Sequence, residues 1–215
     1  MTRPTVPQAL TLLLGLSLAL PALAQETAAP AEEAPAGTGD LSLGTPAAPA
    51  PDGPGSLYVA SEHGDWQVRC VRTEDGSDPC QLYQLLREEA GNSVAEISLF
   101  PLPEGQQAVA GATIVVPLET LLPEQLRLQV DGAEARLYPF TWCAPEGCVA
   151  RVGLTEGEVD AFKRGRSASV RVVPVVAPDQ EVVAQISLMG FTAAYEALLA
   201  AEAANAAPPA DGAAD

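Results

Sequence analysis

Apolar and polar residues alternate along most of the middle of the chain, which is typical of β-strands with one face on a core. In the first clear case Trp66, Val68 and Cys70 fall on one face, and Gln67 and Arg69 on the other. The same alternation, or an enrichment in β-branched residues, recurs between turn-forming residues further along. These further segments are 81–86, 93–99, 112–116, 126–130, 135–142, 148–154, 169–176 and 182–188.

Two segments have helical spacing instead. Thr155 and Glu158 form a capping-box pattern, in which each side chain can bond the backbone of the other, and apolar residues follow on one face. A second helix is predicted after Gly190, with Thr192 as a possible cap. The apolar residues of the two predicted helices are Val159 and Phe162, and then Phe191, Tyr195, Leu198 and Leu199.

About nine short strands with few helices predict an all-β domain. We expect an antiparallel immunoglobulin-like β-sandwich with two short helices, the last of them at the C-terminus. A closed β-barrel is the alternative, because the same alternation also suits strands around a barrel.

The two ends of the chain differ in composition from this domain. Residues 1–24 resemble a secretory signal peptide, with an early arginine, an apolar run and small residues before a cleavage site expected after Ala24. Residues 25–56 are rich in alanine, proline and acidic side chains and are expected to be a disordered spacer, and 201–215 a disordered tail. The domain is therefore predicted over 57–200. The mature protein is expected in the periplasm or secreted, with no transmembrane segment after signal cleavage.

The charge narrows the choice of partners. The chain has a formal net charge of −17, and residues 57–200 hold 20 acidic against 10 basic side chains. Such a field repels phosphate backbones, so nucleic acid is not an expected partner. The basic cluster at 163–166 falls where the first predicted helix ends, and cations suit the negative end of a helix dipole.

Four cysteines lie in two close pairs after the expected signal peptide, namely Cys70, Cys80, Cys143 and Cys148. An even number in an exported chain predicts disulfides, since oxidising compartments let thiols pair. Four cysteines allow three pairings, and the turn residues inside each pair favour Cys70 with Cys80 and Cys143 with Cys148. A zinc site is the weaker alternative, because only the second spacing fits a zinc knuckle.

No pattern for catalysis, a cofactor or a metal is evident. The single histidine, His63, lies beside Gly64 and Asp65 and is expected in a solvated turn rather than in a catalytic triad. Acidic residues are plentiful, but no spacing singles out an acid–base pair. The aromatic residues Trp66, Phe140, Trp142, Phe191 and Tyr195 are expected in the core rather than around a ligand. The protein is therefore expected not to be an enzyme.

Several motifs resemble those of the invasion-associated locus B (IalB) family of exported bacterial proteins. The matching pieces are 66–70 (WQVRC), 80–84 (CQLYQ), 116–118 (VPL), 130–132 (VDG), 139–143 (PFTWC), 147–150 (GCVA) and 186–194 (ISLMGFTAA). Two places depart from that pattern, because Glu119 and Gln125 stand where the family tends to have glycine, so this loop is expected to take a different turn geometry.

The resemblance implies an exported β-domain without known catalytic residues. We expect a non-enzymatic, disulfide-stabilised binding or interaction module with a protein partner in the periplasm or envelope. One alternative is an extracellular adhesion or host-cell invasion factor, which rests on the family name. Another is an envelope hydrolase that uses two converging carboxylates.

Overall fold

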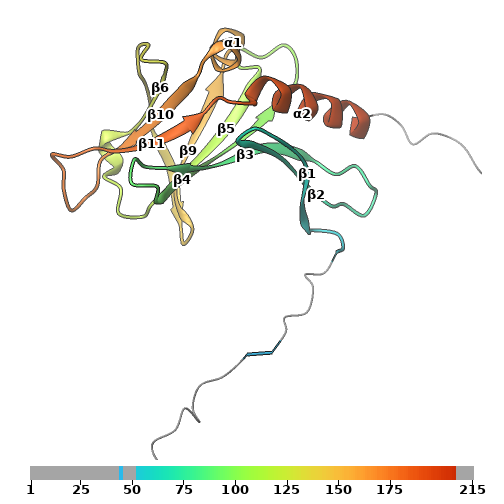
Figure 1. Ribbon diagram of the computed structural model, residues 1–215, viewed down its shortest axis with the longest axis horizontal. Helices are drawn as coiled ribbons and strands as arrows, with labels where there is room; N and C mark the ends of the chain where they lie inside the picture. Colours follow the sequence, from blue (N-terminus) through green and yellow to red (C-terminus); the bar gives the residue numbers. More distant parts are fainter. Residues whose placement is uncertain (1–43, 46–51, 207–215) are drawn as a thin grey trace, which may run out of the picture. The chain divides into compact units, whose positions relative to one another are not determined.

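The computed structural model describes residues 44–45 and 52–206, and the fold occupies the second of these ranges. Its elements follow the chain almost entirely as strands, with helices after β9 and β11 (Figure 1). They are β1 (Leu57–His63), β2 (Trp66–Val71), β3 (Cys80–Arg87), β4 (Ser93–Pro101), β5 (Ala110–Val116), the 3₁₀ helix η1 (Leu122–Glu124), β6 (Leu126–Val130), β7 (Arg136–Tyr138), β8 (Phe140–Ala144), β9 (Gly147–Leu154), α1 (Glu156–Arg164), β10 (Ser167–Val172), β11 (Val182–Ser187) and α2 (Phe191–Ala206).

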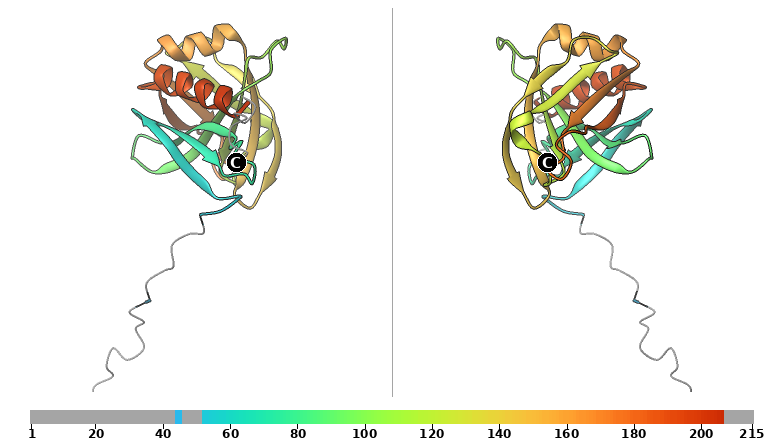
Figure 2. Two further views of the ribbon diagram at one scale, coloured as in Figure 1. Left: turned by 90° about the vertical axis from the view of Figure 1, so that its right-hand side faces the viewer. Right: turned by 90° about the vertical axis from the view of Figure 1, so that its left-hand side faces the viewer.

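The strands form one sheet rather than two. The described strands join in the order β7-β6-β10-β11-β3-β4-β5-β9-β8, with β2 and then β1 added beside β3, and every pairing is antiparallel. The sheet curls around a common interior into a nearly closed barrel (Figure 2). The all-β prediction is confirmed, but the immunoglobulin-like sandwich is not, and the barrel alternative describes the fold better.

A bend at Pro139 explains why the sheet continues instead of splitting in two. The segment 135–142 was predicted as a single strand, whereas the structure breaks it at Pro139 into β7 and β8. The first piece pairs with β6 and the second with β9, so one stretch of chain joins the two ends of the sheet order. A proline lacks the N–H that a central strand needs, which favours such a corner.

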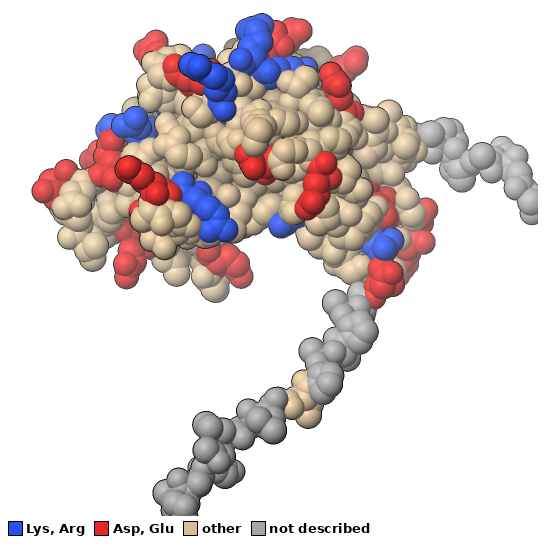
Figure 3. All heavy atoms as spheres, viewed as in Figure 1, with Lys and Arg blue, Asp and Glu red and all other residues tan. Residues whose placement is uncertain are grey.

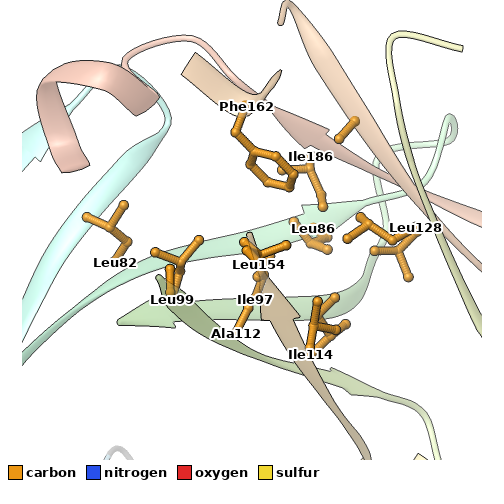
Figure 4. Close-up of a cluster of buried hydrophobic side chains, with 14 of the residues drawn as sticks. Leu82, Leu86, Ile97, Leu99, Ala112, Ile114, Leu128, Leu154, Phe162 and Ile186 are labelled. Atoms are coloured by element: carbon orange, nitrogen blue, oxygen red, sulfur yellow. The ribbon is translucent and has the colours of Figure 1, made fainter. Parts of the chain in front are cut away.

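The core lies inside the barrel and is mostly aliphatic. Figure 4 shows side chains from β3, β4, β5, β6, β9, β11 and α1 pointing toward one another. Strand β2 illustrates the pattern, because its buried residues are Trp66, Val68 and Cys70, as the alternation predicts. The labelled core side chains are Leu82, Leu86, Ile97, Leu99, Ala112, Ile114, Leu128, Leu154, Phe162 and Ile186.

Both helices cover the same end of the barrel (Figures 1 and 2). Helix α1 starts at the predicted capping box, where the Thr155 N–H donates to Glu158 Oε2 at 2.8 Å. Phe162 of α1 and Phe191 of α2 lie with ring centres 5.3 Å apart, and Phe191 also contacts Trp66 at 5.2 Å. These aromatic contacts fix both helices to the barrel. Thr192 is not a cap, because its hydroxyl donates to the Lys163 carbonyl at the end of α1.

The barrel has a seam between β3 and β11, which share only the pair Arg87–Gln185. Beyond that pair the buried side chain of Gln84 takes the place of a backbone neighbour. Its Nε2 donates to the Ser187 carbonyl at 3.0 Å, and its Oε1 accepts from the Ser187 N–H at 2.8 Å. The Trp66 indole N–H donates to the same carbonyl at 2.8 Å. Two side chains thus satisfy backbone groups where the ladder opens.

The domain is longer at both ends than the predicted range 57–200. Asp52 forms an ion pair with Arg72, so contacts to the barrel begin inside the predicted spacer. Helix α2 continues to Ala206, past the predicted start of a disordered tail. There the Glu202 carboxylate accepts from the Cys80 N–H at 2.9 Å, which anchors this part of the helix. The predicted signal peptide and the rest of the spacer and tail lie outside the described residues.

Gln125 ends the 3₁₀ helix with an unusual backbone, at φ 58° and ψ 165°. This is one of the two non-glycine residues at positive φ among those described, and a conformation that glycine adopts far more easily. Gln125 therefore takes a backbone conformation suited to glycine, and the expectation of a different turn geometry stays a prediction.

Candidate functional site

The four predicted site cysteines form two disulfides in the structure. Cys70 is bonded to Cys80 and Cys143 to Cys148, the local pairs that the turn residues favour. Each joins directly opposite residues of neighbouring strands, β2 with β3 and β8 with β9. Among the described residues no cysteine is free. The bonds therefore staple two hairpins at separate places in the sheet and do not form one site.

The groups that catalysis or metal binding would need are not gathered together. His63 ends β1 instead of lying in a turn, and its Nε2 is 3.0 Å from the Ser61 hydroxyl. Within the described ranges no carboxylate bonds its other ring nitrogen, and no cluster of three potential metal ligands occurs. Nor does any helix in this part of the chain have the length and apolar character needed to cross a bilayer.

Three carboxyl groups are held in a state opposite to that of a general acid. A general acid needs a raised pKa, as in glycosidases. Hydrogen bonds from Thr73 and Ser77 lower the pKa of Asp75 to about 2. Hydrogen bonds from the Ser167 and Arg166 N–H groups lower the pKa of Asp131, and those from Thr73 and Tyr58 lower that of Asp78. These shifts favour structural carboxylates that stay ionised.

The aromatic residues divide between core and surface. Trp66, Phe191 and Tyr195 are buried, as predicted, and Phe140 is partly buried. Trp142 lies on β8 with 49% of its surface exposed, so its prediction as a core residue is wrong. The charged residues on the face shown in Figure 3 are also mixed, with acidic side chains scattered among basic ones.

Two loops hold each other in place and present aliphatic side chains to solvent. The loop after β5 and the loop after β10 are joined by the bridge Thr120–Pro174. Backbone bonds flank it, from Leu121 N to Val173 O at 2.7 Å and from Val175 N to Glu119 O at 2.8 Å. The four exposed residues, called the loop platform below, are Leu118 (54%), Leu122 (40%), Val175 (54%) and Val176 (80%).

A broad polar hollow of about 810 Å³ lies along β2, β3 and β11. Its charged side chains are largely bonded to their neighbours. The Arg69 guanidinium stacks 3.3 Å above the centre of the Tyr83 ring and donates to Gln67 at 2.9 Å. Arg87 donates to the Gly91 carbonyl at 2.9 Å. These contacts hold Arg69 and Arg87 in place against the wall of the hollow.

A second cavity, the mouth pocket, opens at the helix-covered end of the barrel. It has a volume of about 500 Å³ and lies between α1 and the β6–β7 hairpin. Core side chains lie at its inner end, namely Leu128, Leu154 and Phe162. Small residues leave the space open, with Ala133 and Ala135 on the hairpin and Ala161 on the helix.

Polar groups converge at the rim of the mouth pocket. The Arg136 Nε lies 2.8 Å from Glu158 Oε1, while Glu158 Oε2 accepts from the Thr155 hydroxyl at 2.7 Å and from its N–H. Burial, and then the Glu158 charge, raise the pKa of Tyr138, and the Arg136 charge opposes the rise. The Tyr138 phenol is therefore protonated at neutral pH and can donate a hydrogen bond.

Sequence reasoning pointed to neither the loop platform nor the mouth pocket. Arg136, Tyr138 and Ala161 lie in segments interpreted as an ordinary strand and helix, and nothing in their spacing shows that they meet. Val175 and Val176 were assigned to a strand, although Pro174 just before them indicates that the strand has ended.

Comparison with known proteins shows to which family the chain belongs. The model of the family described as "Invasion associated locus B (IalB) protein" matches residues 66–199, more than half of the chain. The chain belongs to the IalB family. The matched range begins at the first residue of β2 and ends inside α2, so it includes the barrel core, both disulfides and the mouth pocket.

Named relatives share this description. The "Invasion protein B homolog" proteins of two Brucella abortus strains, 2308 and biovar 1 strain 9-941, are each 27% identical over 159 residues, which cover 74% of this chain and 88% of theirs. The crystal structure of invasion associated protein B from Bartonella henselae superimposes with a TM-score of 0.55 at 23% identity, covering 67% of this chain and 97% of that one. The structural likeness supports the fold, and the relatives are named as invasion proteins rather than enzymes.

Proposed function

We propose that this IalB protein is an exported, non-enzymatic interaction module of the periplasm or envelope, and that a protein partner docks on the loop platform. The observation that carries the proposal is the platform itself, four exposed aliphatic side chains on two loops that are bonded to each other. Exposed apolar side chains gathered on a surface are typical of protein contacts.

The backbone of the platform is already ordered, which favours binding. The bridge Thr120–Pro174 and its flanking hydrogen bonds fix both loops, so docking would cost little backbone entropy. The Thr120 hydroxyl also donates to the Pro117 carbonyl at 2.7 Å, which holds the start of the first loop. Burial of Leu118 and Val176 would then supply favourable free energy at the centre of a contact.

Cross-linking in envelope extract of the producing bacterium tests this proposal. The full-length mature protein is compared with the double variant Leu118→Asn, Val176→Asn. Leu57→Asn with Val59→Asn is the matched control, because these β1 side chains are also exposed (53% and 45%) but lie far from the platform in the chain.

We expect a reproducible cross-linked protein with the wild type and the β1 control, and at least about a tenfold weaker interaction with the platform variant. A contact that all three proteins make equally would contradict docking on the platform. The lack of any reproducible partner would contradict an interaction module.

A second candidate function is adhesion or host-cell invasion outside the cell. It is supported by the description of the family and by the names of the Brucella relatives. Protease treatment of intact cells separates the two, since an adhesin must be accessible. Digestion in intact cells supports the adhesin, and protection until the outer membrane is opened rules it out.

A further inference from the structure

The mouth pocket has the size and shape of a binding site rather than of a packing defect. Protein interiors are close-packed, with few voids larger than a water molecule. A space of about 500 Å³ that reaches core side chains therefore stands out, and its volume falls within the usual range of ligand pockets. Leu128, Leu154 and Phe162 lie at its inner end but are each at most 5% exposed, so the apolar surface that a ligand can contact comes mainly from Val130, Ala133, Ala135 and Ala161.

The rim of this pocket has hydrogen-bond donors to spare. Arg136 is held through Nε alone, and neither of its Nη groups has a partner among the described residues. The Tyr138 hydroxyl also makes no hydrogen bond within that part of the chain, and its phenol is neutral at physiological pH. An arginine has five N–H donors in a planar fork that suits a carboxylate.

The acceptors at the rim are in contrast already engaged. Glu158 uses one oxygen for Arg136 and the other for Thr155, and it must stay there to begin helix α1. Glu134 also lines the pocket, and water and salt screen its charge as they do that of Arg136, because both side chains are exposed. A ligand that completes this rim must therefore bring acceptors, and one that fills the interior must bring an apolar body.

We propose that the mouth pocket binds a single-chain amphiphile with a carboxylate head group, with its hydrocarbon chain along Val130, Ala133, Ala135 and Ala161 and its carboxylate on Arg136 and Tyr138. This assignment is independent of the loop platform and of any protein partner.

Calorimetric titration of the purified, delipidated mature protein with dodecanoate below its micelle concentration tests the proposal. Dodecanol has the same tail without the charge, and dodecyltrimethylammonium has the opposite charge. We expect dodecanoate to bind at least about tenfold more tightly than either, since only a carboxylate can accept charge-assisted hydrogen bonds from the Arg136 guanidinium. Equal binding of the three amphiphiles, or no binding of dodecanoate, would overturn the proposal.

Variants separate the head-group contact from the cavity. Arg136→Gln should weaken dodecanoate about tenfold and leave dodecanol unchanged, while Arg151→Gln, at an exposed arginine of β9, should change neither. Ala161→Leu fills the cavity and should abolish binding of both amphiphiles. Ala135→Leu does the same from the hairpin, in case the helix variant does not fold.

Melting curves establish that each variant is folded before titration. If dodecanoate binds Ala161→Leu and Ala135→Leu as tightly as the wild type, the site lies elsewhere and the proposal is wrong. The platform variant Leu118→Asn, Val176→Asn should bind dodecanoate normally. Its titration therefore keeps a failure of the docking proposal distinct from a failure of this one.

Discussion

Replacing Gln84 with methionine tests whether one side chain holds the barrel together at its seam. Gln84 is 6% exposed and makes three hydrogen bonds, two of them across the opening between β3 and β11 and one to the turn between β1 and β2. Its Nε2 donates to the carbonyls of Ser187 at 3.0 Å and Asp65 at 3.3 Å, and its Oε1 accepts from the Ser187 N–H at 2.8 Å. Methionine has a similar length to glutamine, but its side chain is apolar and can form none of these bonds.

The cost differs for the three groups left behind. The Ser187 N–H loses its acceptor behind a side chain that is 6% exposed, which costs about 1–3 kcal/mol. The Ser187 carbonyl keeps the hydrogen bond from the Trp66 indole N–H at 2.8 Å. Losing the second donor, Gln84, therefore costs only about 0.5–1 kcal/mol. Asp65 lies in an exposed turn, where water replaces the lost donor. The sum is a loss of about 2–4 kcal/mol, which is large against a typical stability of about 5–15 kcal/mol.

Urea unfolding followed by circular dichroism measures this loss as a lower midpoint with an unchanged slope. Gln185→Met is the matched control, since Gln185 sits on the neighbouring strand β11 with its side chain exposed. We expect it to change stability by less than about 0.5 kcal/mol. A loss below about 1 kcal/mol for Gln84→Met would refute the argument that this side chain replaces the missing ladder.

A double-mutant cycle with Trp66→Phe tests whether the two side chains share one acceptor. Both Gln84 and Trp66 donate to the Ser187 carbonyl, so removing the second donor should cost more once the first is gone. Additive effects would show that the two side chains do not share this acceptor in solution.

Three further predictions concern single backbone or charge features. Gln125→Gly should stabilise the protein by about 0.5–2 kcal/mol, because it relieves the backbone strain at φ 58° and ψ 165°. Gln125→Ala keeps this strain and should give no such gain in the same urea assay. Gly190→Ala should cost at least about 2 kcal/mol, because φ is +85° and a Cβ would collide with the His63 carbonyl, whereas Gly157→Ala in α1 meets nothing and should be neutral or stabilising. The folded-state pKa of Asp131 lies below its unfolded value, so its contribution to folding stability is complete above about pH 4 and is lost as the pH falls through the folded pKa. Melting temperatures measured from neutral pH to about pH 2 should therefore show the wild type losing its advantage over Asp131→Asn in acid. A constant difference between the two proteins would contradict this.

Local patterns in the sequence predict most elements of this fold. Alternation identifies β2 because Trp66, Val68 and Cys70 are all buried, and the capping box locates the start of α1. Strand β1 was missed because it packs at the rim of the barrel and most of its residues are exposed, so the period of two is weak. Helix α2 extends past Ala200 because Glu202 and Asn205 bond the loop before Cys80, a contact that composition does not reveal.

The sites were harder to predict than the strands. The seam was visible only as a polar residue, Gln84, at an inward position between Leu82 and Leu86, with no indication of its partner. The mouth pocket depends on Arg136 and Ala161 meeting across a fold that sequence reasoning took to be a sandwich. Such contacts come from the tertiary arrangement, which periodicity does not describe.

The seam also has a consequence for the order in which the chain can fold. Strands β1 to β5 pair with their sequence neighbours and can form as successive hairpins, but Gln84 must wait for Ser187, 103 residues later. Loop closure over such a distance is slow compared with hairpin formation. We therefore expect the second half of β3, beyond the part that pairs with β2, to remain an open edge until the last strand is available, so that barrel closure is a late event. Pulsed hydrogen exchange during refolding would show this as protection in β4 before protection of the Ser187 amide, and simultaneous protection would contradict it.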